Sequence, residues 1–551
     1  MCNIIYTKEQ EDIFQYAKTG VENILVEAVA GAGKTTTLIE CVKHIIKFHG
    51  PDKKILLLAH NKSTRDTLKD KVEISLEKAG LPHDRVYVYT LHGLAYCLFL
   101  EHFKRKPNNN DINDDKYKIY LGKHINDIAT ESYLELNYAN KMVYRSNVLN
   151  LINMGRHYLK TGERELKKLA KKLEFTLIAD ECHMVNNILK WGRENLDVLD
   201  FQDLLYLPSQ LGYRTNIFKA DYIFLDEAQD ASVAQQDIIS RCIQRHTKLI
   251  AFGDTDQTIN SWCGSDIESL QRIKNNEDNK FGKKAKSMPL TTNYRCGKKI
   301  IEYAKRYSDK TGTLNEIKPH LNAPEGSVNF EKHLSDIKNG DMVLCRNTAP
   351  LMELYRRMVS NGQKIYFKGE ELGKTLINNV DNTNGFTMKE IIFNLKRSLI
   401  AQWELLTKST GLEPRETITA PQIISTFDVI KTLEELPKNI LNKDDLKNFV
   451  KEIFKNEGHE GIQLSTIHRA KGLEADNVFI ICPSLIPSRL ARTESEIAEE
   501  KRLQYVMCTR PKESLNFVTE KDIRPNNAYS ENNSFYDELM NIKNEIQTWE
   551  N

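Results

Sequence analysis

Several features are scarce or missing in this sequence of 551 residues, and each absence narrows the possibilities. No apolar run approaches the roughly 20 residues that a membrane-spanning helix needs, so we expect no membrane anchor. The ten cysteines are scattered, without a Cys-x-x-Cys pair or a Cys/His spacing typical of zinc sites. They indicate reduced thiols in a soluble intracellular protein rather than a disulfide framework. Met1 leads into a polar start, and no signal peptide is predicted.

An excess of one charge is also absent. Lys and Arg number 78 and Asp and Glu number 76, so the formal net charge is only +2. A chain with this balance is not basic throughout, and any nucleic-acid binding must use local patches. Hydrophobic residues make up 40% of the chain, which is enough for real cores. The length corresponds to three or four compact units.

The most informative stretch that is present runs from Glu27 to Thr36 and reads EAVAGAGKTT. An apolar run, Ile24 to Val26, precedes it, and a helix-like run, Thr36 to Phe48, follows it. A strand, a glycine loop ending in Gly-Lys-Thr and a helix form the phosphate-binding loop pattern. Small residues let backbone N–H groups turn toward a triphosphate, and the helix N-terminus adds partial positive charge. The alternative is a glycine-rich turn without nucleotide, and Ala28 departs from the generic motif's first glycine.

Individual residues near this loop have predicted contacts with nucleotide. Lys34 can reach the β- and γ-phosphates, and the Thr35 hydroxyl can hold Mg²⁺. Gln10 lies just upstream of the first strand, where its amide can read the edge of adenine. Taken alone, Gln10 is better explained as an ordinary residue at a helix start.

A second buried strand, Tyr222 to Leu225, ends in Asp226-Glu227. This arrangement predicts that Asp226 holds the Mg²⁺ shell and that Glu227 orients and deprotonates the attacking water. A further strand, Lys248 to Phe252, leads to Gln257, which can sense the γ-phosphate. Trp262 follows and can offer its face to a base, although core packing is the alternative.

A similar acidic stretch, LIADECH from Leu177 to His183, imitates this pattern. Apolar residues around it recur at intervals of three and four, which favours a long helix over an isolated strand. We therefore reject Asp180 and Glu181 as metal ligands.

Polar residues also follow two other strand-like runs, Ile55 to Ala59 and Val86 to Tyr89. In an open parallel sheet the ligand face lies at the carboxyl ends of the strands. The residues after these runs are therefore candidates for substrate contact. They are His60, Asn61, Thr90 and His92.

The coarse pattern is α/β, with two strand-and-helix cores that are each interrupted by a mainly helical insertion. The first insertion combines Lys/Arg clusters with tyrosines, which suits nucleic-acid contact but equally a solvated helix face. The final amphipathic helix is predicted to dock on the second core, with partner binding as the alternative. The predicted parts are 1–94 and 196–289 for the first core, 95–195 for its insertion, 290–370 and 459–551 for the second core with the terminal helix, and 371–458 for its insertion.

The motifs form an ordered series that resembles the UvrD/Rep/PcrA-like group of superfamily 1 DNA helicases. Two of them, LAHNKS and TLHGLAY, are most similar to the F-box DNA helicase branch, although no F-box precedes Gln10. The series comprises Gln10, AVAGAGKT, LAHNKS, TLHGLAY, DFQDLL, FLDEAQD, GDTDQTINSW, LTTNYRC, STIHRAKGLE and EEKRLQYVMCTR.

The resemblance implies two RecA-like cores of the P-loop NTPase type, with ATP and Mg²⁺ as cofactors. It implies Gln257 and Arg295 as γ-phosphate contacts and Arg510 as an arginine finger. It also implies that Trp262 joins the four strand-end residues in a single-strand groove. The implied nucleotide contacts are Gln10, Ala30, Gly31, Ala32, Gly33, Lys34, Thr35, Thr36, Gly472 and Glu474, with Asp226 and Glu227 for metal and water.

The resemblance further implies an ATP-dependent DNA helicase or translocase that moves 3′ to 5′ on single-stranded DNA and meets single-strand/duplex junctions. The pathway stays open among DNA repair, replication, recombination control and a viral role, and the second insertion or the terminal helix can bind a protein partner. Three alternatives stay open: a translocase without unwinding, an ATP-gated binding switch, and an RNA helicase. Asn260, Cys263 and His60 depart from the residues usual in the group and weaken the expected DNA contacts.

Overall fold

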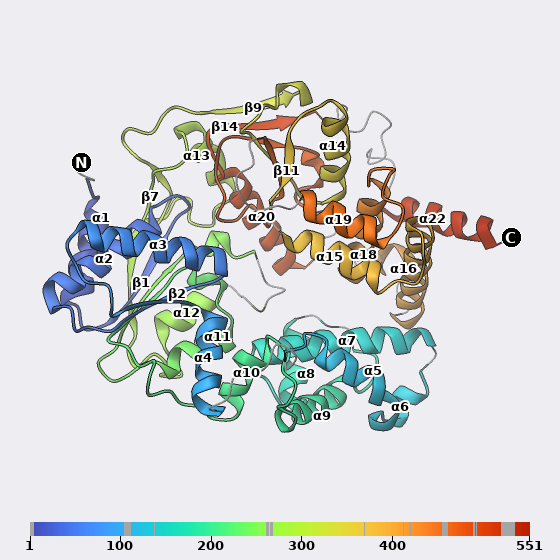
Figure 1. The fold of residues 1–551 in the computed structure, drawn as a ribbon, viewed down its shortest axis with the longest axis horizontal. Coiled ribbons are helices and arrows are strands. Elements are labelled where there is room, and N and C mark those ends of the chain that lie inside the picture. Colours follow the sequence, from blue (N-terminus) through green and yellow to red (C-terminus); the bar gives the residue numbers. More distant parts are fainter. Residues whose placement is uncertain are drawn as a thin grey trace. The chain divides into compact units, whose positions relative to one another are not determined.

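The computed structural model describes residues 5–103, 112–136, 138–173, 175, 177–259, 264, 268–368, 370–410, 413–417, 421–453, 461–488, 491, 493–519 and 535–550. The chain divides into two compact units (Figure 1). The first comprises Met1–Tyr294 and Gly312–Lys318, and the second comprises Arg295–Thr311 and Pro319–Asn551.

The first unit contains a six-stranded parallel sheet with the order β3-β2-β4-β5-β1-β6. Every residue of β2 and β4 is buried, as expected for inner strands that helices cover on both faces. The strands are β1 (Asn23–Ala28), β2 (Ile55–Ala59), β3 (Val86–Thr90), β4 (Tyr222–Leu225), β5 (Lys248–Gly253) and β6 (Ala285–Leu290); the short strands β7 (Thr292–Asn293) and β8 (Lys318–Pro319) follow.

The helices of this unit fall into two groups, those that alternate with the strands and those of the insertion after β3. The first group is α1 (Lys8–Thr19), α2 (Lys34–His49), α3 (Lys62–Lys78), α10 (Asp203–Gln210), α11 (Val233–Arg241) and α12 (Ser269–Asn275). The second is α4 (Leu91–Phe103), α5 (Lys116–Ile128), α6 (Glu131–Leu134), α7 (Tyr138–His157), α8 (Glu163–Lys172) and α9 (Glu181–Glu194).

The insertion shares one hydrophobic cluster with the sheet. Buried residues such as Leu151 on α7 and Ile188 on α9 belong to the same cluster as Leu56 and Leu58 on β2. The predicted long helix through this region is wrong, because the chain forms two helices, α8 and α9, with a non-helical link between them. The apolar spacing continues across the link because both helices bury residues in the same cluster.

The second unit contains another six-stranded parallel sheet, with the order β11-β12-β10-β13-β14-β9. Its central strand β10 (Met342–Cys345) is buried at every position. The other strands are β9 (Ser327–Lys332), β11 (Ile365–Phe367), β12 (Ile462–Thr466), β13 (Ala475–Ile480) and β14 (Pro511–Val518).

A helical insertion separates β11 from β12 in this unit. Its helices are α15 (Glu370–Asp381), α16 (Met388–Thr410), α17 (Pro414–Thr417), α18 (Pro421–Glu434) and α19 (Lys443–Ile453). The remaining helices are α13 (Lys298–Ala304), α14 (Ala349–Ser360), α20 (Glu494–Cys508) and the terminal α22 (Phe535–Glu550).

The terminal helix α22 packs onto the second unit, as predicted, but its partners are the inserted helices. Leu539 is fully buried in the cluster that contains Trp403 of α16 and Ile430 of α18. Lys396 of α16 lies 2.8 Å from Glu545 of α22. The helix therefore completes the packing of the insertion.

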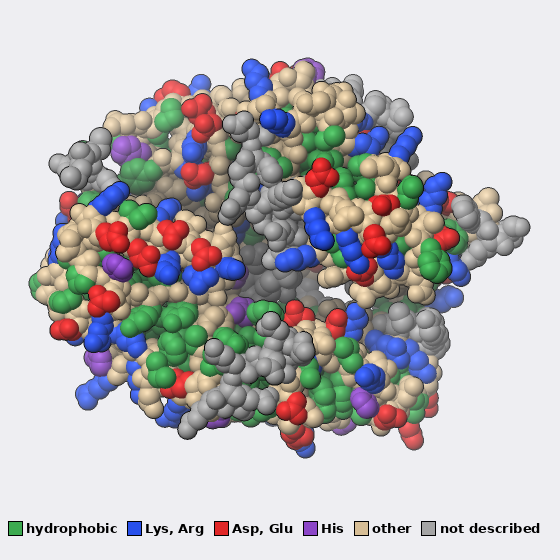
Figure 2. Space-filling view, in the orientation of Figure 1, with side chains coloured by type: hydrophobic (Ala, Val, Ile, Leu, Met, Phe, Trp, Pro, Cys, Tyr) green, Lys and Arg blue, Asp and Glu red, His purple; other side chains and the backbone are tan. Residues whose placement is uncertain are grey.

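The predicted α/β class, with two parallel-sheet cores and a helical insertion in each, is confirmed. Among the described residues, no helix combines the length and the apolar character that crossing a membrane requires. On the face shown in Figure 2, basic and acidic side chains are interspersed, in keeping with the small net charge.

If α22 belongs to the core of the second unit, truncating its central leucine must destabilise that unit. We expect Leu539→Ala to cost about 2–5 kcal/mol, since it leaves a cavity in a buried cluster. Urea unfolding followed by circular dichroism measures the change. Leu441→Ala is the matched control, because Leu441 is 63% exposed; equal stability of the two variants would contradict this packing.

Candidate nucleotide site and nucleic-acid face

Strand register brings the predicted nucleotide residues to one edge of the first sheet. Leu58 of β2 pairs with Leu225 of β4, and Leu225 pairs with Ala251 of β5. Glu27 of β1 pairs with Gly253 of β5. The segments that follow β1, β2, β4 and β5 therefore leave the sheet together, at the carboxyl edge where ligands bind in such folds.

The glycine loop after β1 has the backbone that its sequence predicts. Gly31 and Gly33 have φ angles of 64° and 75°, a region that side chains disfavour. The Asn293 side chain donates to the Ala30 carbonyl at 2.7 Å, and the Tyr294 amide donates to the Gly31 carbonyl at 2.9 Å. Because C=O and N–H of one trans peptide point in opposite directions, the Ala30–Gly31 peptide turns its N–H away from Asn293. This orientation suits a phosphate-binding loop.

Lys34, the first residue of α2, forms an ion pair with Glu227. Its Nζ lies 3.1 Å from Oε1 and 3.2 Å from Oε2 of that carboxylate. Burial alone would lower the pKa of Lys34, but the negative charges of Glu227, Asp254 and Asp226 outweigh it and raise that pKa. Lys34 is therefore a fixed positive charge at the loop, as γ-phosphate contact requires.

Asp226 directly follows β4 and is 4% exposed. Burial and the neighbouring charge of Glu227 raise the pKa of Asp226 to about 6, against the opposing effect of Lys34. Two crowded carboxylates beside one lysine form a donor set that fits a divalent cation. Among the described residues no three His, Cys, Asp or Glu side chains form a metal cluster. A site with one carboxylate and the Thr35 hydroxyl, completed by phosphate oxygens and water, is the kind that Mg²⁺ prefers.

A buried glutamine joins the ends of β4 and β5. Gln229 donates to Glu227 Oε2 at 2.5 Å, and its Oε1 accepts from the Asp254 amide at 3.0 Å. Gln257 in turn donates to Asp254 Oδ2 at 2.6 Å. Glu227 itself has a φ of 51°, a left-handed conformation that is uncommon outside glycine and frequent at functional sites.

Gln10 lies beside the loop, as the adenine-reading prediction requires. Its Nε2 donates to the Thr37 hydroxyl at 3.0 Å, and its Oε1 accepts from the Thr7 amide at 3.0 Å and the Tyr294 hydroxyl at 3.3 Å. The side chain is only 4% exposed. Its amide is therefore fixed in orientation, which selective recognition of a base edge needs.

The predicted residues of the second unit also come together. Arg295 Nε lies 2.7 Å from Glu474 Oε2, and Arg295 Nη1 donates to the Thr509 carbonyl at 3.1 Å. Arg510 is buried and donates to the Val506 carbonyl at 2.9 Å and the Leu473 carbonyl at 3.2 Å. Gly472 has a φ of 84°, which favours glycine. The roles of Arg295 and Arg510 toward phosphate stay predictions.

The candidate nucleic-acid residues lie at the carboxyl ends of two adjacent strands: His60 and Asn61 follow β2, Thr90 ends β3, and His92 lies in the first turn of α4. Asn61 caps α3 by accepting from the Thr64 amide at 2.8 Å, and the Thr90 hydroxyl accepts from the Gly93 amide at 2.9 Å. Burial and the nearby His60 lower the pKa of His92 to about 4, so His92 is neutral at physiological pH. Trp262, Asn260 and Cys263 lie outside the described residues.

The rejected acidic stretch has a structural role. The Glu181 carboxylate accepts from the backbone amides of Ile178 and Ala179, both at 2.9 Å. The Asp180 carboxylate accepts from the Tyr144 hydroxyl at 3.0 Å. Both side chains thus organise the turn that begins α9.

Sequence reasoning missed three residues that organise the nucleotide site: Gln229, Asp254 and Asn293. Gln229 and Asp254 carried a usable signal, because each is a polar residue within a few positions of the end of a buried strand. Asn293 carried none, since its bond to Ala30 joins residues far apart in the chain.

Comparison with known families agrees with this geometry. The UvrD/REP helicase N-terminal domain matches residues 7–278, and the UvrD-like helicase C-terminal domain matches residues 389–522. Together the two matches span roughly three quarters of the chain. The chain belongs to the UvrD/Rep helicase family.

Individual UvrD/Rep relatives are distant but match along most of the chain. "ATP-dependent DNA helicase Rep" of Buchnera aphidicola is 21% identical and covers 90% of this chain and 92% of its own length. "ATP-dependent DNA helicase PcrA" of Staphylococcus aureus is 24% identical and covers 94% and 83%. "F-box DNA helicase protein 1" of Schizosaccharomyces pombe is 23% identical over 92% of this chain, which spans 57% of that relative.

The raised pKa of Asp226 predicts how the stability of the nucleotide-free protein depends on pH. A carboxyl group whose pKa is about 6 in the folded state and ordinary in the unfolded state stabilises the fold at low pH and loses that contribution as the pH rises through 6. We expect Asp226→Asn to raise the stability of the nucleotide-free protein at pH 7.5 by on the order of 1–3 kcal/mol. The gain should shrink below pH 6 and vanish near pH 4 (about the unfolded value).

Thermal unfolding of both proteins across this pH range, without nucleotide or Mg²⁺, tests the prediction. Asp70→Asn is the control, because Asp70 is an exposed residue of α3 outside the site. A variant at position 226 that is less stable than the wild type at pH 7.5 would contradict the crowding of charge described above.

Proposed function

We propose that this chain is an ATP-dependent DNA helicase that moves 3′ to 5′ along single-stranded DNA. One observation carries the proposal: Lys34, Asp226, Glu227 and Gln257 converge beside a phosphate-binding loop. A water-activating carboxylate next to a charged lysine supports hydrolysis rather than binding alone. The relatives Rep and PcrA are named ATP-dependent DNA helicases, which supports ATP and DNA as the substrates.

The proposed chemistry divides among residues of the first unit. Bound Mg-ATP supplies the phosphoanhydride whose hydrolysis drives the motor. Lys34 offsets the negative charge of the β- and γ-phosphates, and Asp226 with Thr35 holds the metal. Glu227 orients water and accepts its proton. Gln229 fixes the Glu227 carboxylate, so the base is held in place before substrate arrives.

Other residues have proposed roles in recognition. Gln10 reads adenine, since its amide is held on both sides. Gln257 senses the γ-phosphate. Arg295 and Arg510 keep their predicted roles as γ-phosphate contact and arginine finger, with Gly472 and Glu474 near the nucleotide.

For nucleic acid, we propose that the strand passes the carboxyl ends of β2 and β3. Motors of this kind are expected to couple nucleotide state to grip on the strand. His60, Asn61, Thr90 and His92 are the proposed contacts, with Trp262 as a further one.

Strand separation on matched substrates tests the proposal. Two DNA duplexes of one sequence carry either a 3′ or a 5′ single-stranded tail, and a third duplex carries a 3′ RNA tail. We expect ATP-dependent unwinding of the 3′-tailed DNA alone, measured by release of a fluorescent strand. Lys34→Ala is the control for dependence on hydrolysis.

The other outcomes each point elsewhere. Unwinding only from the 5′ tail would keep the motor and reverse its direction. Hydrolysis without unwinding on any substrate would favour a translocase or a switch. Preference for the RNA tail would assign the chain to RNA.

A further inference from the structure

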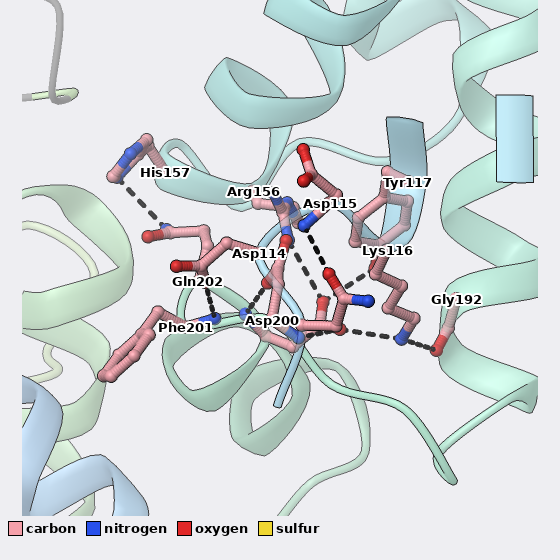
Figure 3. Close-up of polar contacts among 12 residues, drawn as sticks. Asp114, Asp115, Lys116, Tyr117, Arg156, His157, Gly192, Asp200, Phe201 and Gln202 are labelled. Carbon is pink, nitrogen blue, oxygen red and sulfur yellow. Dashed lines mark hydrogen bonds and ion pairs between the residues drawn. The ribbon is translucent and has the colours of Figure 1, made fainter. Parts of the chain in front are cut away.

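Four charged side chains outside the nucleotide site are buried together in the first unit (Figure 3). Arg156 Nη1, at the end of α7, lies 2.6 Å from both carboxylate oxygens of Asp200 and 3.2 Å from Asp203 Oδ1. Lys116 Nζ, at the start of α5, lies 2.7 Å from Asp203 Oδ2. None of the four side chains is more than 7% exposed. The two positive and two negative charges balance.

Neighbouring groups complete this buried network. The Tyr117 hydroxyl donates to Asp203 Oδ1 at 2.7 Å, and Lys116 donates to the Gly192 carbonyl at 3.3 Å. The Arg156 guanidinium lies 4.4 Å from the centre of the Tyr117 ring. Burial, together with the charge of Asp203, raises the pKa of Tyr117, so its hydroxyl remains a donor. Arg156 Nε is buried without a hydrogen-bond partner among the described residues.

Stability alone is a weak reason for such a network. Removing two ion pairs from water costs about as much as their attraction returns, and apolar residues of similar size often stabilise a fold more. Directional bonds do, however, select one arrangement of the groups that they join. The network is therefore better explained by the conformation that it fixes in one segment of the chain.

The segment is the loop from Leu199 to Gln202, which joins the insertion to α10. Asp200 lies within it, and Asp203 follows it. The Asn113 amide donates to the Leu199 carbonyl at 2.6 Å, and the Phe201 amide donates to Asp114 Oδ1 at 3.2 Å. Residues before α5 and at the end of α7 thus hold the loop on both sides.

This loop adjoins the candidate nucleic-acid face. The Phe201 ring is 6.3 Å from the His92 ring and edge-on to it, and Phe201 is 52% exposed. Gln202 Nε2 lies 3.1 Å from Nδ1 of His157, the residue after Arg156. The loop therefore links the buried charges directly to His92, a predicted contact for the nucleic-acid strand.

We propose that Arg156 and Lys116 are positioning residues for nucleic-acid binding. Through Asp200 and Asp203 they hold the Leu199–Gln202 loop in the conformation that places Phe201 beside His92. This inference rests on the proposed function, because it needs the strand to pass His92. It adds a device by which the helical insertion shapes the face formed by the sheet.

Two variants test it. Arg156→Lys keeps the charge but removes Nη1, the atom through which Arg156 contacts both aspartates. Arg156→Met with Asp200→Asn removes the pair without leaving an unpaired charge, since Lys116 still balances Asp203. The matched control is Arg193→Lys, because Arg193 donates to the Tyr206 hydroxyl at 2.7 Å and does not contact the loop.

The probe is a fluorescein-labelled oligothymidylate of about 20 nucleotides, longer than the usual binding sites of such grooves. Fluorescence anisotropy gives its Kd, and ATP hydrolysis without DNA and the melting temperature are measured alongside. We expect both variants to bind roughly three- to thirtyfold more weakly, with DNA-free hydrolysis within about twofold of wild type and an unchanged melting temperature for the double variant. Arg193→Lys should bind like the wild type.

Wild-type affinity in both Arg156 variants would overturn the positioning role. A parallel loss of affinity, DNA-free hydrolysis and melting temperature in both would also overturn it, because it would show a general structural role. A wild-type protein that fails to bind the oligonucleotide would instead overturn the proposed function.

Discussion

The ion pair between Lys34 and Glu227 is the interaction on which the candidate nucleotide site of this chain depends. It joins the glycine loop after β1 to the end of β4 across 3.1 Å, with both side chains largely buried. Asp226 and Asp254 add negative charge that Lys34 alone does not neutralise. A site with this charge excess favours bound cations, and the crowding of negative charge raises the pKa of Asp226. The backbone supports the same geometry, because Asn293 and Tyr294 hold the loop carbonyls from the other side.

The inner strands could be predicted from the sequence because burial on both faces demands an apolar run. The predicted strands Ile55–Ala59 and Tyr222–Leu225 agree with the inner strands β2 and β4 at both ends. The strands β6 and β9 were not predicted. Each lies at the edge of its sheet, and their sequences, AKSMPL and SVNFEK, mix polar with apolar residues. These two edge strands lack the apolar run that identifies inner strands, whereas the edge strand β3 has a run of Val and Tyr residues and was predicted.

In the candidate site, too, residues in local motifs could be predicted, whereas residues whose contacts depend on distant parts of the chain could not. Lys34, Asp226 and Glu227 could be predicted because each follows a buried strand in a motif of fixed spacing. Asn293 could not, since its bond to the loop depends on how β6 pairs with β1. The buried charges of the first insertion are a further case, because Lys116 and Arg156 meet the aspartates only after α5, α7 and α9 have packed.

The most direct test of the account is steady-state ATP hydrolysis by Glu227→Gln, together with its affinity for a fluorescent ATP analogue. We expect turnover to fall by roughly a hundred- to ten-thousandfold, because the substituted amide cannot accept the proton of the attacking water. We also expect affinity for the analogue to remain close to that of the wild type, since Lys34 and the loop are intact. Hydrolysis by Glu227→Gln at the wild-type rate would contradict the assignment of Glu227, and with it the catalytic site described here.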